Sequence, residues 1–361
     1  MRAAVLGVGL IGGSIGLAAR QRLGCEVVGW GPRRATLERA VELGAVDRPA
    51  DSVGEACAGA DVVFCASPVS VLPELVAAAL EASGPETVVT DAGSTKRQLV
   101  TALGGDERFI GGHPLAGAET AGVQNARADL FEGARWYLTP TERSSGVLYD
   151  RLQRFVSDLG ARPQAIDAKA HDRLMATVSH LPHVLANVLA AQATAELTRD
   201  SQRMPEAGPS FRDATRVAGS NPSIWADIFT ANREAVVAAI DEAVARLNEA
   251  RELIDAGKPE GIEGWHAAAG ADRGRLLETE PGVGPLREVR VVVPNRPGIV
   301  AELALALGEA GVNIEDMALH PAADMQSGAI SLWVAGDEQA ERAVGLLTEL
   351  GHSATALGEG A

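Results

Sequence analysis

Two short polar segments, each at the end of a predicted strand, carry a hydroxyl and an imidazole. Ser94 follows the apolar run Thr87–Asp91, and His113 follows Phe109–Gly111. Because the carboxyl ends of parallel strands meet at one edge of an open α/β sheet, we expect Ser94 and His113 to lie close together. A neutral imidazole with an ordinary pKa of about 6.5 is suited to accept a proton, and a nearby hydroxyl would orient it. The pair indicates general-base chemistry; a structural histidine in a Gly/Pro turn is the alternative.

Three further side chains are candidates for holding an anionic substrate. His180 and His183 are three residues apart in a helical pattern and project from similar faces, and Pro182 between them predicts a kink. Arg216 has the planar guanidinium that binds a carboxylate bidentately. The alternatives are a helix-packing histidine pair and a surface ion pair of Arg216 with Asp213. Because no HExxH motif is present, we expect substrate contacts rather than a metal site.

A glycine-rich loop directly after the first apolar run indicates dinucleotide binding. Gly7 permits a tight turn, Gly9 lets the backbone approach a pyrophosphate, and Gly12 allows close packing of helix on sheet. The same loop reads GxSxG around Ser14, the pattern of a serine-hydrolase elbow, but that elbow normally follows a strand well inside the chain. The expected cofactor-binding residues are Gly7, Gly9, Leu10, Ile11, Gly12, Arg33, Arg34 and Ser67.

The end of the second predicted strand, Glu26–Trp30, lacks the acidic residue that binds the ribose hydroxyls of NAD. Gly31 stands in its place and is followed by Arg33 and Arg34. Two arginines can pair with a 2′-phosphate, although arginines that open a helix are also common as solvated charges. We therefore expect NAD(P) as the cofactor, with NADP favoured over NAD.

The elements that must position these residues divide into three predicted domains. Residues 1–167 alternate β-rich and helical segments, which is typical of a mainly parallel, doubly wound Rossmann-type sheet. Residues 168–278 have helical periodicity and predict an all-helical domain, with one long helix over 167–197. Residues 286–361 have a βαββαβ order, the ferredoxin-like arrangement, after a linker at 280–285. The strands expected in the first domain are Ala3–Leu6, Glu26–Trp30, Asp61–Ala66, Thr87–Asp91, Phe109–Gly111, Trp136–Thr139 and Gln164–Ile166.

Composition excludes several classes of protein. The 361 residues are 46% hydrophobic and 22% charged, which is ordinary globular usage. The net charge of −16, without a basic block, predicts no nucleic-acid partner. The apolar stretches are short and interrupted, and the N-terminus enters a strand directly, so we expect no membrane partner and a cytoplasmic location. The cysteines, Cys25, Cys57 and Cys65, form no CxxC motif and are expected to be packed thiols.

Together these segments resemble the prephenate and arogenate dehydrogenase family of tyrosine biosynthesis. The resemblance implies oxidative decarboxylation of prephenate to 4-hydroxyphenylpyruvate, with hydride transfer to NAD(P)+, in a homodimer built on the helical domain. It implies that His113 takes the proton of the C4 hydroxyl and that Ser94 orients His113. Arg216 would bind a substrate carboxylate, and His183 with His180 the side-chain end. The matching segments are Gly7–Gly12, Asp91–Lys96, His113–Gly117, Ser179–His183 and Phe211–Arg216 with Trp225–Phe229.

Residues 286–361 resemble an ACT domain, a module that commonly binds a regulatory amino acid. The matching segments are Asn295–Gly298 and Gly311–Ile314. The resemblance implies feedback by tyrosine or another aromatic amino acid. The expected regulatory residues are Asn295, Gly298, Asn313 and Ile314.

Three alternatives stay open at this level. Arogenate or an amino-substituted prephenate differs from prephenate only in one group, and no residue separates these substrates. A non-catalytic sensor of dinucleotide and amino acid has no need of Ser94, His113 and Arg216 together. A 3-hydroxyacid or 6-phosphogluconate-type dehydrogenase would require a catalytic lysine in the helical domain, where neither Lys169 nor Lys258 lies in a recognisable motif.

Overall fold

The computed structural model forms two compact units, residues 1–247 and 248–361. It describes the whole chain except residues 118–120, 200–207, 278–285, 315, 323–326 and 358–361. The predicted linker at 280–285 lies outside the described residues. The units do not coincide with the three predicted domains, whose boundaries stay a prediction.

A parallel five-stranded sheet forms the centre of the N-terminal region, in the spatial order β3-β2-β1-β4-β5. The order steps outward from β1 in both directions, which is the doubly wound arrangement that the sequence predicted. Its strands are β1 (Arg2–Leu6), β2 (Glu26–Trp30), β3 (Arg48–Pro49), β4 (Val62–Cys65) and β5 (Val88–Asp91). The helices between and after them are α1 (Leu10–Leu23), α2 (Arg34–Glu42), α3 (Val53–Cys57), α4 (Leu72–Ala82) and α5 (Arg97–Leu103).

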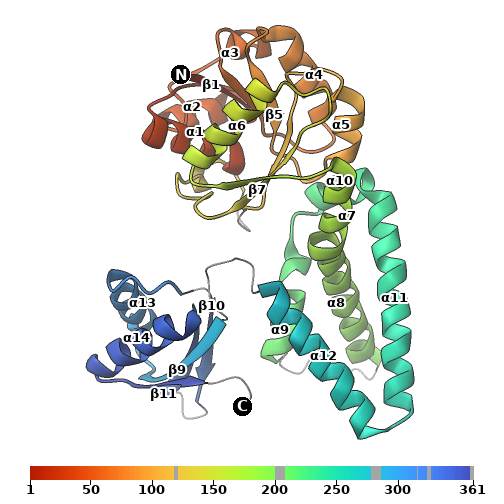
Figure 1. Cartoon of the computed structure of the whole chain (residues 1–361), viewed down its shortest axis with the longest axis vertical. Helices are drawn as coiled ribbons and strands as arrows, with labels where there is room; N and C mark the ends of the chain where they lie inside the picture. Colours follow the sequence, from red (N-terminus) through yellow and green to blue (C-terminus); the bar gives the residue numbers. More distant parts are fainter. Residues whose placement is uncertain (118–120, 200–207, 278–285, 315, 323–326, 358–361) are drawn as a thin grey trace. The chain divides into compact units, whose positions relative to one another are not determined.

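Helices cover both faces of this sheet (Figure 1). Successive side chains of a strand point to opposite faces, so Ala3 and Val5 pack with α1, α2 and α6 (Gly146–Asp158), whereas Ala4 and Leu6 pack with α3, α4 and α5. Cys25, Cys57 and Cys65 are buried and free, which confirms the prediction of packed thiols.

The last three strands predicted for the first sheet form a sheet of their own. β6 (Gly111–Pro114) is antiparallel to β7 (Arg135–Thr139), and β8 (Arg162–Ala165) is parallel to β7. In the described part of the β6–β7 connection the only helix is the 3₁₀ turn η1 (Val123–Asn125). Since a parallel return needs a crossover, β7 runs antiparallel to β6 instead. The seven strands predicted for this region are therefore divided between two sheets, and only the first five-stranded sheet is the doubly wound one.

Helices make up the rest of this unit. The predicted long helix is interrupted: a π-helical turn, η2, lies between α7 and α8, just before Pro182. Proline has no N–H for the carbonyl of Val178, and its ring displaces that carbonyl, so the predicted irregularity is confirmed. The elements are α7 (Ala168–Met175), η2 (Ala176–His180), α8 (Leu181–Arg199), α9 (Pro209–Thr215), the 3₁₀ turn η3 (Arg216–Gly219), α10 (Pro222–Ala231) and α11 (Arg233–Asp255), which runs into the second unit.

The segment Ala168–Ala195 is long and apolar enough, by length and composition alone, to span a membrane. This corrects the expectation that no stretch reaches that length. Only 22% of its most apolar window is buried, and Leu185, Val188 and Leu189 are exposed. Their spacing places them on one face of α8. Among the described residues, α8 therefore presents an exposed apolar face.

The C-terminal unit contains α12 (Pro259–Leu277) and a four-stranded antiparallel sheet in the order β10-β11-β9-β12. Its βαββαβ chain order is the predicted one, and residues such as Val291, Leu303 and Leu347 form its core. The elements are β9 (Leu286–Pro294), α13 (Ile299–Glu309), β10 (Asp316–Pro321), β11 (Ser327–Ala335), α14 (Gly336–Glu349) and β12 (Ser353–Leu357).

Candidate active site

The glycine loop between β1 and α1 has the shape that a pyrophosphate requires. Gly7 has a φ of +101°, and a Cβ there would collide with the carbonyl of Ala66. A Cβ on Gly12 would collide with the carbonyl of Gly7, whereas one on Gly9 would meet nothing within 4 Å. Gly7 and Gly12 are thus required for packing, and the open space at Gly9 lets a ligand approach the backbone at the start of α1.

The other predicted loop residues lie around this turn. Leu10 and Ile11 begin α1, and the hydroxyl of Ser67 lies beside Gly7. Ser14 is fully buried, and its Oγ accepts the backbone N–H of Arg127 at 3.0 Å. A buried, bonded hydroxyl is not an exposed nucleophile, so the serine-hydrolase interpretation is wrong.

The two arginines after β2 have different surroundings. The guanidinium of Arg34 pairs with Asp51 at 2.9 Å and with Glu38 at 3.4 Å. Arg33, just before α2, is exposed, and its guanidinium has no polar partner within the described parts of the chain. A Cβ on Gly31 would meet only Leu37, at 3.9 Å. Arg33 is therefore the available cation, and Gly31 leaves room for a side chain or a ligand group.

His113 lies on β6 and is held by a residue that the sequence analysis missed. Its Nδ1 lies 2.9 Å from Nε2 of His171, a fully buried side chain on α7. Ser94 lies in the turn between β5 and α5, and no hydrogen bond between described residues joins it to His113. The orienting role of Ser94 stays a prediction, whereas the contact at Nδ1 belongs to His171.

Asp172 extends this contact into a chain of hydrogen bonds. Its Oδ1 lies 2.9 Å from Nδ1 of His171 and accepts the backbone N–H of Lys96 at 2.8 Å. Its Oδ2 accepts the N–H of Arg97 at 2.9 Å, so the carboxylate caps α5. Burial alone would raise the pKa of Asp172, but these hydrogen bonds outweigh burial and hold the pKa below its ordinary value. Asp172 is therefore an ionised acceptor.

A buried ion pair lies behind the base. The ammonium of Lys96 pairs with the carboxylate of Asp91, and both side chains are fully buried. Asp91 also accepts the backbone N–H of Gly93 at 2.8 Å and of Gly112 at 3.1 Å. The pair thereby ties the end of β5 to β6 beside His113. Asp91 and Lys96 are the two ends of one of the segments that resemble the family, but no role was predicted for either side chain.

His180 is fixed as a neutral side chain. The amide Nδ2 of Asn232 donates to the backbone carbonyl of Asp172 at 2.8 Å and lies 3.1 Å from Nδ1 of His180. Burial lowers the pKa of His180 to about 4; Asp172 opposes the shift, and His171 and His183 reinforce it. Nδ1 is therefore an acceptor, and Nε2 carries the hydrogen that a substrate oxygen can accept.

An aromatic stack brings the predicted substrate contacts together. Trp225 on α10 stacks on His183 with a centroid separation of 3.4 Å and meets His180 edge-on at 5.9 Å. Nδ1 of His183 donates to the carbonyl of Ser179 at 3.0 Å. Burial, together with the nearby charge of Arg216, lowers the pKa of His183 despite that bond. The predicted residues His180, His183 and Arg216 thus form one cluster.

The electrostatics of His113 predict the pH dependence of the reaction. Burial is the main cause that lowers the pKa of His113 well below 6.5, and the neighbouring His171, Lys96 and His180 reinforce the shift. A base with a lowered pKa stays unprotonated until the pH falls through that value. We therefore expect kcat/KM to remain near its maximum at about pH 6 and to fall only at lower pH. An acid limb of the kcat/KM profile with its midpoint at about pH 6.5 or above would contradict this placement of His113.

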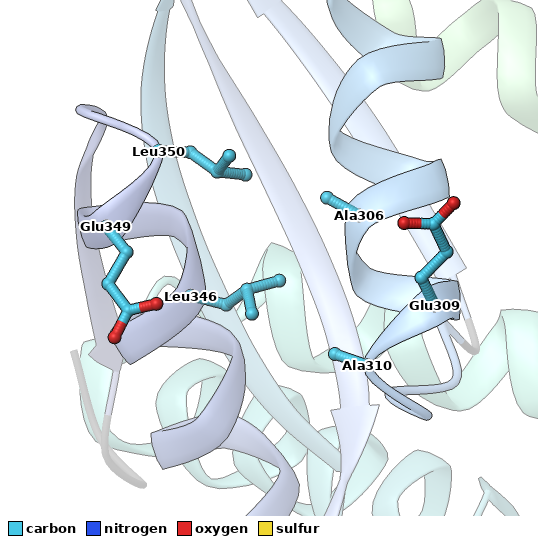
Figure 2. A pocket seen from close by; sticks show the side chains of 6 residues that line it. All are labelled: Ala306, Glu309, Ala310, Leu346, Glu349 and Leu350. Carbon is cyan, nitrogen blue, oxygen red and sulfur yellow. The ribbon is translucent and has the colours of Figure 1, made fainter.

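The predicted regulatory residues gather around the two ends of α13. Gly298 caps its start with a φ of +87°, Asn295 precedes it, and Asn313 and Ile314 follow it. Ile314 packs against the core. A separate hollow of about 520 Å³ lies between α13 and α14, where Figure 2 shows side chains of both helices facing one another. It is lined by Ala306, Glu309, Ala310, Leu346, Glu349 and Leu350, none of which the sequence singled out.

The fold and the site together define a class of protein: a Rossmann-type dehydrogenase in which the first helix of the helical region contacts a histidine of the dinucleotide-binding region. Residues 15–164 match the family described as "Prephenate dehydrogenase, nucleotide-binding domain", and residues 167–266 match "Prephenate dehydrogenase, dimerization domain". The chain belongs to the prephenate dehydrogenase family of NAD(P)-dependent oxidoreductases.

Individual relatives agree with this assignment. The prephenate dehydrogenase of Bacillus subtilis (strain 168) is 29% identical over 352 residues, which are 93% of each chain. A crystal structure of prephenate dehydrogenase from A. aeolicus, in complex with hydroxyphenyl propionate and NAD+, is 30% identical, with a TM-score of 0.72 over 76% of this chain and 98% of that one. Arogenate dehydrogenase from Synechocystis is 27% identical, with a TM-score of 0.68 over 76% of this chain and all of that one.

Proposed function

We propose that this chain catalyses the oxidative decarboxylation of prephenate to 4-hydroxyphenylpyruvate in tyrosine biosynthesis. The observation that carries the proposal is the placement of His113, whose Nδ1 is bound to a buried histidine while Nε2 has no hydrogen bond to a described residue and can act as a base. The test is product analysis: 4-hydroxyphenylpyruvate, CO2 and NAD(P)H must form in equal amounts. Reduced cofactor without CO2 would refute it.

Each proposed catalytic group has one task. His113 takes the proton of the C4 hydroxyl as the C4 hydrogen leaves with its electron pair. The electrons of the C1–carboxylate bond then enter the ring, CO2 departs, and the proton returns to the phenolic oxygen. Arg216 binds a carboxylate of the substrate, and His180 with His183 binds its side-chain end. The nicotinamide, when bound, accepts the hydride.

We propose NADP as the preferred cofactor, because Arg33 is exposed beside Gly31 and no carboxylate stands at that position. The A. aeolicus relative, in contrast, is described in complex with NAD+. The preference for NADP therefore rests on Gly31 and Arg33 of this chain alone.

Replacing Gly31 with Asp should invert this preference. The new carboxylate would accept hydrogen bonds from ribose hydroxyls and repel a 2′-phosphate. We expect the ratio of kcat/KM for NADP to that for NAD to fall at least about tenfold, which corresponds to about 1.4 kcal/mol. Gly264→Asp, exposed on α12 where a Cβ would meet nothing within 4 Å, is the control for added charge. An unchanged ratio would show that this position does not select the cofactor.

We propose that the chain works as a homodimer in the cytoplasm. The exposed apolar residues of α8, Leu185, Val188 and Leu189, belong to the segment that matches a dimerization domain and would be covered by a second copy. Three free cysteines suit a reducing compartment. Sedimentation of the intact chain tests the dimer.

We propose that the C-terminal sheet is an ACT-like domain that binds tyrosine or a related amino acid. The support is its βαββαβ order and the loops that carry Asn295, Gly298, Asn313 and Ile314. The B. subtilis relative aligns with 93% of this chain, so it shares at least part of this unit.

Substituting Asn295 and Asn313 by Ala in the full-length chain should raise the tyrosine concentration for half inhibition by about tenfold or more. The physical reason is the loss of hydrogen bonds to a small polar ligand. Uninhibited kcat should stay unchanged. Glu341→Gln, an exposed change on α14, is the control. Inhibition at the wild-type concentration would place the effector at the active site instead.

The choice of substrate is the remaining alternative. Relatives are described both as prephenate and as arogenate dehydrogenase. Arogenate carries an ammonium where prephenate carries a keto oxygen. The Nε2–H of His180 is a donor and suits the keto oxygen better, so we favour prephenate over arogenate or another amino-substituted prephenate.

A further inference from the structure

The hydrogen-bond chain Asp172–His171–His113 determines more than the position of one ring. We propose that His171 and Asp172 are positioning residues that fix the tautomer of His113 and leave its Nε2 as the atom that receives the proton. The inference rests on the proposed function only for the identity of the proton donor.

The carboxylate of Asp172 determines where the hydrogens of this chain lie. Asp172 accepts the backbone N–H groups of Lys96 and Arg97, at 2.8 and 2.9 Å, so both its oxygens act as acceptors. The ring nitrogen Nδ1 of His171 lies 2.9 Å from one of them. A carboxylate that only accepts requires this Nδ1 to carry a hydrogen.

The second step assigns the other nitrogen of His171. The ring is fully buried, and a buried imidazolium loses the hydration that stabilises its charge, so the neutral ring is favoured. A neutral His171 with hydrogen on Nδ1 has a lone pair on Nε2. That lone pair lies 2.9 Å from Nδ1 of His113 and accepts its hydrogen.

The third step follows for the base itself. His113 with hydrogen on Nδ1 has its lone pair on Nε2, where it can take a proton from the substrate. The imidazolium that forms on His113 keeps its hydrogen bond to His171, and His171 is in turn bonded to the negatively charged carboxylate of Asp172. Burial and the buried ammonium of Lys96 otherwise disfavour the charged form of His113. The chain therefore stabilises a charge that appears only during the reaction.

The anchoring of Asp172 explains why this arrangement is rigid. Its side chain caps α5, and its backbone carbonyl accepts a hydrogen bond from Nδ2 of Asn232, which also contacts His180. Asp172 thus connects α7 with the start of α5 and with Asn232, which lies between α10 and α11. A shift of α7 would change the contacts of both His113 and His180 at once.

The first test is a direct measurement of tautomers in the full-length wild-type protein. Histidine labelled with ¹⁵N distinguishes protonated from unprotonated ring nitrogens, and spectra of His113→Asn and His171→Gln assign the two signals. We expect both His113 and His171 to be neutral with hydrogen on Nδ1 at pH 7. Hydrogen on Nε2 of His113, or a doubly protonated His171, would overturn the inference.

The second test uses two substitutions at His171. Phe retains the ring shape without an acceptor, whereas the amide oxygen of Gln can accept from His113. We expect His171→Phe to lower kcat on the order of 10²-fold with KM little changed. His171→Gln should recover most of kcat. Equal losses in both variants, or a change confined to KM, would show a merely structural role.

These tests separate the inference from the proposed function. The tautomers are measured without substrate, so the expected tautomers with no turnover of prephenate would refute the function alone. Turnover with the opposite tautomer would refute the inference alone. Thermal unfolding and binding of NAD(P)H verify that each variant is folded. If His171→Phe does not fold, the tautomers measured in the wild-type protein still test the inference.

Discussion

His113→Asn should lower kcat by about 10² to 10⁴-fold while cofactor binding stays unchanged. Asparagine can retain a hydrogen bond near His171, but its amide accepts no proton at neutral pH. The loss therefore falls on the chemical step, and the dissociation constant of NAD(P)H, which depends on the loop at Gly7–Gly12, should equal that of the wild type. Stopped-flow measurement of a single turnover gives the rate of that step directly.

The control for His113→Asn is His266→Asn, an exposed change on α12. Its kcat should be that of the wild type. Turnover of His113→Asn within about threefold of the wild type would show that another group takes the proton, and Ser94 would be the first residue to examine.

Arg216→Ala should mainly raise the KM for prephenate. A charge-assisted hydrogen bond to a carboxylate contributes about 1.5 to 3 kcal/mol, which corresponds to about 10- to 150-fold. Because Arg216 also lowers the pKa of His183, its removal should bring that pKa closer to the ordinary value. Steady-state kinetics with varied prephenate at saturating cofactor measures the effect.

Arg212 provides the matched control for Arg216. It is exposed on α9, one turn earlier, and Arg212→Ala should leave KM within about twofold. Arg216→Lys should recover only part of the affinity, because an ammonium cannot form the bidentate pair. A KM for Arg216→Ala equal to that of the wild type would remove Arg216 from the substrate site.

The glycine loop and the candidate base were predictable because each depends on local sequence. The loop Gly7–Gly12 takes its shape mainly from residues that are close to it in the sequence. His113 was predicted because it lies at the end of a strand. The separate sheet of β6, β7 and β8 was not predictable in the same way. Its strands have ordinary β-rich sequences, and their direction depends on the long connection from 115 to 134.

The missing partner of His113 illustrates a different difficulty. His171 and His180 are nine residues apart, which in a regular helix of about 100° per residue places them on opposite sides. The π-helical turn η2 changes this angle by part of a turn, so that Asn232 bridges Asp172 and His180. Pro182 was a visible signal of that irregularity, but its consequence for the histidines depends on the tertiary contacts.

The most direct test of the account is the initial rate of nicotinamide reduction with prephenate and with arogenate, each offered with NAD and with NADP. We expect turnover with prephenate, faster with NADP than with NAD, and slower turnover with arogenate. Faster turnover with arogenate would contradict the role given to His180. No turnover in any of the four mixtures, with the cofactor bound, would contradict the central claim and favour a non-catalytic sensor.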